Sequence, residues 1–187
     1  MRVIAGSAKG RKLGPVPSGV RPVSDRAREG LFSSLAAEIP EARVLDLYAG
    51  TGAMGIEALS RGAEACVFVD RSSEACALIY GNLAMTGLQD RATVVAADAG
   101  AFLNGHDRSS GPFDLVLLDP PYELAGPDLA LVLGELSSGW LAEDGWTVAL
   151  TRGVKSSTPV IPVHWAVARQ LRYGDSLVIL HREVSWA

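Results

Sequence analysis

Residues 44–55 read Val-Leu-Asp-Leu-Tyr-Ala-Gly-Thr-Gly-Ala-Met-Gly. The apolar first half is typical of a buried strand, and the second half is rich in glycine. Glycines between a strand and a helix let the backbone approach a ligand closely at the helix N-terminus. The spacing Gly50-x-Gly52-x-x-Gly55 satisfies the dinucleotide fingerprint, and Asp70 follows where a ribose-binding acid is expected. The loop alone does not distinguish NAD from S-adenosylmethionine, and a tight turn without a ligand gives the same pattern.

Outward from this stretch, apolar strands alternate with amphipathic helices. We expect strands at residues 44–48, 65–70, 93–97, 115–118, 147–150, 166–171 and 177–181, and helices at 52–61, 73–85, 99–103 and 127–134. Continuous apolar strands linked by helices indicate a parallel sheet covered on both faces. The last two strands are too close for a helical crossover and are expected to form a hairpin. The predicted fold is therefore α/β and Rossmann-like, a doubly wound, mostly parallel seven-stranded sheet with one antiparallel strand at its end.

The chain before this sheet has a different character. Arg2 to Leu13 is predicted to form a small β-hairpin around a glycine-rich turn, and a proline-rich connection follows. Ser24 or Asp25 can cap a helix that runs through Leu35. We divide the chain into an N-terminal arm, residues 1–23, and a single α/β domain, residues 24–187.

Charge is distributed unevenly between these parts. Residues 1–28 carry a net charge of +6, which leaves −10 for the other 159 residues of a chain whose total is −4. A basic arm on an acidic body is typical of a nucleic-acid-binding protein, although a solvated charged surface gives the same count. We expect the basic side chains to contact RNA phosphates: Arg2, Lys9, Arg11, Lys12, Arg21, Arg26 and Arg28.

Several other classes of protein do not fit the composition. Two cysteines and three histidines form no zinc-binding spacing, so neither a disulfide nor a metal ion is expected. No apolar run reaches the roughly 18 residues that a membrane span needs, and the N-terminus lacks the pattern of a signal peptide. We expect a monomeric cytoplasmic protein with no membrane partner.

Acidic residues follow three consecutive predicted strands. Asp46 would repel a pyrophosphate but suits the positively charged amino-acid end of S-adenosylmethionine. Asp70 is suited to ribose hydroxyls and Asp98 to an adenine amino group. Each acid alone can be a helix cap, but the carboxyl ends of parallel strands line the crevice where ligands bind. The expected cofactor-binding set is Asp46, Tyr48, Ala49, Gly50, Thr51, Gly52, Asp70, Arg71, Asp98, Ala99 and Asp119.

The fourth central strand runs directly into Asp119-Pro120-Pro121-Tyr122. Two prolines cannot continue a central ladder, so they are expected to fix a rigid turn, which a capping Asp alone would also explain. An exocyclic amino group on a base is a poor nucleophile because its lone pair is delocalised. Hydrogen bonds to Asp119 and to the Pro120 carbonyl would orient that lone pair, and Tyr122 would stack on the base. We expect this tetrapeptide to be catalytic.

Together these motifs resemble the amino-methyltransferase branch of class I methyltransferases, and most closely the RsmD family of bacterial 16S ribosomal RNA guanine-N2 methyltransferases. The resemblance also covers residues 2–6, 10–13, 21–32 and 57–63, and the arginine-rich N-terminal stretches are its specific part. It implies S-adenosylmethionine as cofactor and a guanine of 16S ribosomal RNA, in partly or fully assembled 30S subunits, as substrate.

Three alternatives remain open from the sequence. A DNA adenine-N6 or cytosine-N4 methyltransferase would use the same tetrapeptide. An NAD-dependent oxidoreductase would use the same glycine spacing. A non-catalytic RNA-binding module that has kept a cofactor fold would be inactive on every RNA.

Overall fold

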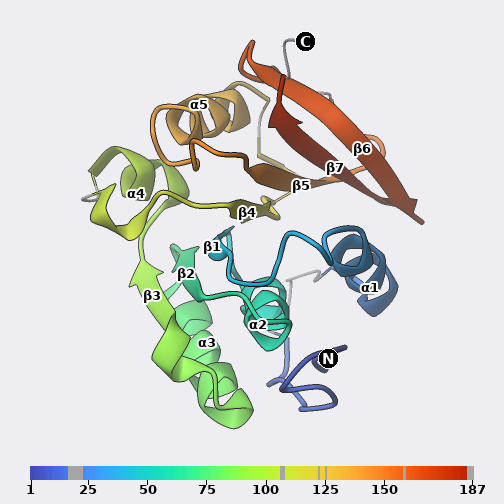
Figure 1. The fold of residues 1–187 in the computed structure, drawn as a ribbon, viewed down its shortest axis with the longest axis vertical. Helices are drawn as coiled ribbons and strands as arrows, with labels where there is room; N and C mark the ends of the chain where they lie inside the picture. Colours follow the sequence, from blue (N-terminus) through green and yellow to red (C-terminus); the bar gives the residue numbers. More distant parts are fainter. Residues whose placement is uncertain (17–22, 106–107, 122, 125, 158, 185–187) are drawn as a thin grey trace.

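Seven strands form one sheet in the order β3-β2-β1-β4-β5-β7-β6 (Figure 1). The computed structural model describes residues 1–16, 23–105, 108–121, 123–124, 126–157 and 159–184. The strands are β1 (Arg43–Leu47), β2 (Ala65–Asp70), β3 (Ala92–Ala96), β4 (Leu115–Leu118), β5 (Thr147–Gly153), β6 (Trp165–Tyr173) and β7 (Ser176–Glu183). The helices are α1 (Asp25–Ser34), α2 (Ala53–Ser60), α3 (Ser73–Thr86), α4 (Ala99–Gly105) and α5 (Gly126–Leu136), with short 3₁₀ helices η1 (Gln89–Arg91) and η2 (Arg108–Ser110).

The strand directions confirm the predicted fold class and refine one detail. Strands β1 to β5 pair in parallel, and β7 is antiparallel to both β5 and β6. The antiparallel strand was expected at the end of the sheet, but β7 lies one position inside it and β6 is the edge. The reason is that the second strand of the hairpin, not the first, pairs with β5.

Helices cover both faces of the sheet, with α1, α2 and α3 on one side and α4 and α5 on the other (Figure 1). The alternation of side chains along β1 shows how each face is filled. Val44 belongs to the core under the first group of helices, whereas Leu45 and Leu47 belong to the core under the second. Asp46 lies between these leucines and faces α2, where the Gly55 N–H donates to its Oδ2 at 2.9 Å.

The N-terminal arm is a hairpin in outline but not a pair of strands. One isolated antiparallel bridge joins Arg2 to Lys12, so the prediction of two short strands was wrong in extent. The intervening backbone turns toward α2 instead, where the Ser7 N–H donates to the Ser60 carbonyl at 2.8 Å. Val3, Ala8 and Leu13 are buried in the main core. The arm is therefore packed against the α/β domain.

Local capping explains where the first helix begins. The Ser24 Oγ accepts from the Ala27 N–H at 3.2 Å, as the sequence predicts. Leu31, Phe32 and Leu35 are fully buried. Within the described ranges, no helix is long and apolar enough to cross a membrane.

Candidate active site

The glycine loop after β1 has several residues in the left-handed backbone conformation. Tyr48, Gly50 and Gly52 all adopt positive φ, at 62°, 53° and 73°. A left-handed conformation at a non-glycine residue such as Tyr48 costs about 1–2 kcal/mol, so the surrounding structure must hold it in place. The Ala49 N–H donates to the Val69 carbonyl at 3.1 Å, and the Gly52 N–H donates to the Ala49 carbonyl at 2.7 Å.

Asp70, at the end of β2, supports this loop directly. Its Oδ2 accepts from the Gly50 N–H at 2.8 Å, and its Oδ1 accepts from the Ser72 N–H at 2.9 Å. The sequence predicts Asp70 as a ribose ligand but not as a support for the glycine loop. Thr51, the next loop residue, is buried, and α2 begins after Gly52 at its N-cap.

Two of the predicted acids, Asp70 and Asp119, are close enough to Asp46 to affect its pKa. Burial raises the pKa of Asp46 well above its usual range; the hydrogen bond from Gly55 opposes this, and the charges of Asp119 and Asp70 add to it. Burial also raises the pKa of Asp119 to about 7. The acids at the carboxyl-terminal ends of β1, β2 and β4 therefore lie at the same end of the parallel strands.

The third strand contributes its acid more peripherally. Asp98 is exposed, and its Oδ1 accepts from the N–H groups of Gly100 and Ala101 at 2.9 and 3.3 Å, so it caps α4. The helix begins at Ala99, which is buried. Tyr48 lies within electrostatic reach: burial, and then the Asp98 charge, raise its pKa to about 12, while the exposed Arg71 opposes the shift.

Asp119, Pro120 and Pro121, which are expected to be catalytic, continue β4 into this same end of the sheet. Asp119 follows Leu118, the last residue of β4 paired with β1 and β5. Pro120 is buried and Pro121 is exposed. Tyr122 lies outside the described residues, so the stacking role expected of it stays a prediction.

The basic side chains of residues 1–28 that the structure describes divide into an exposed group and a single buried arginine. Arg2, Lys9, Arg11, Lys12 and Arg26 are exposed, as phosphate contacts must be. Arg21 lies outside the described residues. Arg28 is fully buried: its Nη2 donates to the Arg2 carbonyl at 2.6 Å and pairs with Asp25 Oδ1 at 2.9 Å. The prediction that Arg28 contacts RNA phosphate does not fit this structure, because its guanidinium faces inward.

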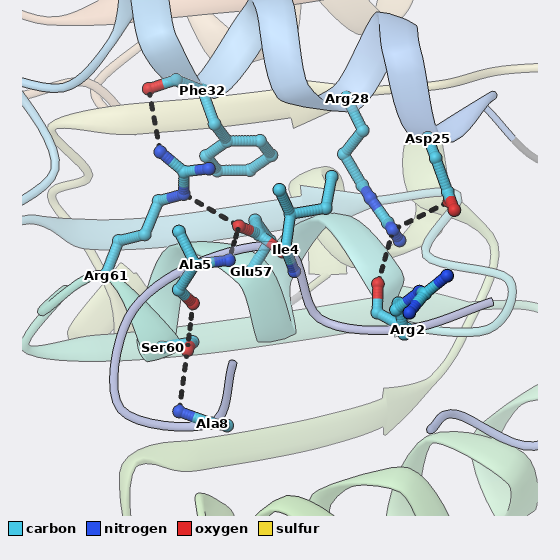
Figure 2. A network of polar contacts seen from close by, with 10 residues as sticks. All are labelled: Arg2, Ile4, Ala5, Ala8, Asp25, Arg28, Phe32, Glu57, Ser60 and Arg61. Carbon is cyan, nitrogen blue, oxygen red and sulfur yellow. Dashed lines mark hydrogen bonds and ion pairs between the residues drawn. The ribbon is translucent and has the colours of Figure 1, made fainter. Parts of the chain in front are cut away.

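Residues that the sequence analysis gave no role attach the arm to the domain (Figure 2). Buried Glu57 accepts from the N–H groups of Ile4 and Ala5 at 2.7 and 3.0 Å, and from Arg61 Nε at 2.7 Å. The Ser60 hydroxyl accepts from the Ala8 N–H at 3.0 Å and donates to the Ala5 carbonyl at 2.6 Å. The one signal in the sequence was that residues 57–63 took part in the family resemblance.

A second unpredicted link is Asn82, which is fully buried on α3. Its Oδ1 accepts from the Gly14 N–H at 2.7 Å, and its Nδ2 donates to the Thr51 carbonyl at 2.8 Å. One side chain therefore binds both Gly14 of the arm and the glycine loop.

The residues at this edge fit S-adenosylmethionine. The acids suit its cationic amino-acid end and its hydroxyls, and Gly50 leaves room beside the loop, since an added Cβ would meet nothing nearer than the Tyr48 carbonyl at 4.0 Å. A pyrophosphate would instead face the carboxylates of Asp46 and Asp119, which disfavours NAD.

The sheet order, the glycine loop after β1 and the acids at the strand ends define a class I methyltransferase. A solved Escherichia coli structure, yhhF, described as a methyltransferase candidate, superposes with a TM-score of 0.86 at 32% identity, covering 100% of this chain and 99% of that one. Ribosomal RNA small subunit methyltransferase D of Escherichia coli strain K12 is 36% identical over 177 residues, 94% of this chain and 86% of the relative.

The family described as conserved hypothetical protein 95 matches residues 1–182. YlbH of Bacillus subtilis strain 168, named as an rRNA methyltransferase candidate, is 40% identical over 150 residues, 80% of this chain and 81% of the relative. The chain belongs to this family, the RsmD family of methyltransferases. The recognition made from the sequence motifs is confirmed.

Proposed function

We propose that this enzyme transfers a methyl group from S-adenosylmethionine to the exocyclic N2 of a guanine in 16S ribosomal RNA, acting in the cytoplasm as a monomer on partly or fully assembled 30S subunits. Methylation of small-subunit ribosomal RNA is the activity for which its relatives are named. The finer proposal depends on one observation: Asp119 stands at the end of β4, beside the other acids, with its pKa raised by burial to about 7.

The chemistry follows from the position of Asp119. In its ionised form the carboxylate accepts one N–H of the target amino group, while the Pro120 carbonyl accepts the other. These two bonds favour a pyramidal nitrogen with its lone pair free. S-adenosylmethionine, when bound, supplies a methyl group activated by a sulfonium. Once the nitrogen has gained the methyl group it is cationic, and Asp119 accepts its proton; a pKa near the working pH suits that transfer. Correct alignment supplies much of the rate.

The other edge residues hold and orient the cofactor. Asp46 and the loop from Tyr48 to Gly52 would contact its amino-acid end, Asp70 with Arg71 its ribose, and Asp98 with Ala99 its adenine. Tyr122 would stack on the flipped base, which is how enzymes commonly hold a base that they modify.

The basic arm, residues 1–23, is the proposed RNA contact. Its exposed cations would bind phosphates and position folded RNA, since phosphate contacts fix register without reading sequence. Arg2, Lys9, Arg11 and Lys12 belong to the arm itself, and Arg26 lies just beyond it on α1.

The test is methyl transfer from labelled S-adenosylmethionine to unmethylated 30S subunits, with naked 16S RNA and duplex DNA in parallel. Mass spectrometry of the digested products identifies the nucleoside. We expect N2-methylguanine, chiefly from the subunits. Methyladenine or methylcytosine in DNA would overturn the substrate, and faster transfer to naked RNA would overturn the preference for assembled subunits.

A further inference from the structure

Arg28 is a buried cation that uses only some of its hydrogen-bond donors. The side chain is 0% exposed. Its Nη2 is occupied by the Arg2 carbonyl and Asp25, as Figure 2 shows. Within the described part of the chain, its Nε and Nη1 are buried and have no hydrogen-bond partner. Buried donors of a charged group are costly to leave unpaired, which suits them to bind a ligand.

Arg28 lines a cavity beside the glycine loop. Met1, Val23 and Arg28 line one side of this cavity. Ala49, Gly50 and Thr51 of the loop line the other side. Arg28 therefore contacts the arm through Nη2 and also lines the cavity beside the proposed cofactor site.

The electrostatic setting suits an anion at this position. Burial lowers the pKa of the Arg28 guanidinium, and the charges of Asp25 and Glu57 counter that effect. Glu57 is already committed to the arm backbone and Arg61, and Asp25 is more than half exposed. The unpaired Nη1 can donate a charge-assisted hydrogen bond to a carboxylate.

We infer that Arg28 binds the carboxylate of the methionyl end of S-adenosylmethionine through Nη1 while its Nη2 holds the Arg2 carbonyl, so that cofactor binding stabilises the RNA-binding arm. The inference rests on the proposed cofactor site.

The coupling has a second physical route. Asn82 joins the Gly14 N–H to the Thr51 carbonyl, so the arm and the loop are connected at two points. A ligand that holds the glycine loop and the Arg28 guanidinium in place makes both of the contacts that attach the arm less mobile. By linkage, RNA held on the arm would strengthen cofactor binding by the same factor.

The experiment tests the contact by removing the carboxylate from the ligand. The Arg28 guanidinium is removed separately, by substitution. Calorimetry would compare S-adenosylhomocysteine with its decarboxylated analogue, S-adenosyl-3-thiopropylamine, on the full chain. The wild type should bind the analogue about 10- to 100-fold more weakly, as expected for the loss of a charge-assisted contact. In Arg28→Met this ratio should fall below about threefold. Arg26→Met removes an exposed charge from the same helix and should keep the wild-type ratio.

Hydrogen exchange on the wild type tests the coupling without any substitution. The reporters are the N–H groups of Val3, Gly10 and Leu13, which donate within the arm. S-adenosylhomocysteine should slow their exchange at least about threefold more than the decarboxylated analogue, both at saturation. Asp25→Asn is expected to keep the ligand ratio.

The outcomes separate the inference from the proposed function. If Arg28→Met folds and keeps the full carboxylate dependence, or if both ligands protect the arm equally, the role of Arg28 is wrong although the cofactor assignment stands. A wild type that loses no affinity without the carboxylate overturns the inference even if Arg28→Met does not fold. A wild type that binds neither ligand overturns the cofactor assignment itself.

Discussion

Asp119 is the residue on which the proposed chemistry depends most directly. Burial raises its pKa to about 7 from an ordinary value of 3.8. The side chain thus changes charge in the range where the enzyme is expected to work. Its neutral form cannot take up a proton from the methylated nitrogen, whereas its ionised form can.

We therefore expect the rate of methyl transfer to rise with pH through a midpoint near 7. Below that midpoint the protonated acid predominates, and each further unit should lower the rate about tenfold because the ionised fraction falls tenfold. Single-turnover rates at saturating S-adenosylmethionine between pH 5.5 and 8.5 measure this. A flat profile would count against Asp119 as the proton acceptor.

The same pKa predicts an effect on stability. The folded state raises the pKa of this acid, so its contribution to stability is fully present below about pH 4 and is lost as the pH rises through about 7. Asp119→Asn should therefore be more stable than the wild type at pH 8, by roughly 1–4 kcal/mol, and show little of that advantage at pH 4. Urea unfolding at both pH values measures the difference.

The same variant separates chemistry from binding. Asp119→Asn should lose transfer activity and keep its affinity for S-adenosylhomocysteine within about threefold. The stability prediction fails if the difference from the wild type is the same at pH 4 and pH 8.

At the scale of the elements, the helices and strands were predictable because hydrophobic periodicity is a local signal. The same local signal predicted the end of β1 and the glycine loop. It also predicted the acids at or near the ends of β2, β3 and β4. The attachment of the arm was not predictable, because its contacts join residues 52 to 68 positions apart. Arg28 was misread because an arginine beside Asp25 on a short amphipathic helix looks solvated until α1 is packed against the arm.

Alanine substitutions at two glycines of the arm can distinguish the cost of backbone strain from the cost of a steric clash with α2. Gly6 and Gly10 both have φ of +82°. A Cβ at Gly6 would lie 1.8 Å from the Ser60 carbonyl oxygen, whereas one at Gly10 would meet nothing within 4 Å. Alanine at either position costs about 1–2 kcal/mol of strain, and only Gly6→Ala must also lift the arm from α2.

Gly6→Ala should therefore expose the arm to hydrogen exchange at least about tenfold more than Gly10→Ala does. Peptides covering residues 1–13, followed by mass spectrometry, give the comparison. Similar exchange in the two variants would show that the contact with Ser60 does not hold the arm.

For the whole molecule, the proposed function gives the basic arm and the acidic body separate tasks, and the two parts meet at α1 and α2. Arm side chains that face outward are free to bind phosphate, and those that face inward, Val3, Ala8 and Leu13, fix it to the core. Because Arg28 faces inward as well, the electrostatic contribution to RNA binding must come from the exposed cations.

We expect the combined change of Lys9, Arg11 and Lys12 to Ala to weaken RNA binding and to flatten its salt dependence. Each lost phosphate contact lowers the slope of log affinity against log salt by about 0.7–0.9, so the triple variant should lose roughly 2–3 in slope. Binding to 30S subunits or 16S RNA between 50 and roughly 300 mM salt measures the slope. Lys155→Ala, an exposed cation outside the arm, serves as control and should leave it unchanged. An unchanged slope in the triple variant, or an equal loss in the control, would mean that another surface binds the phosphates.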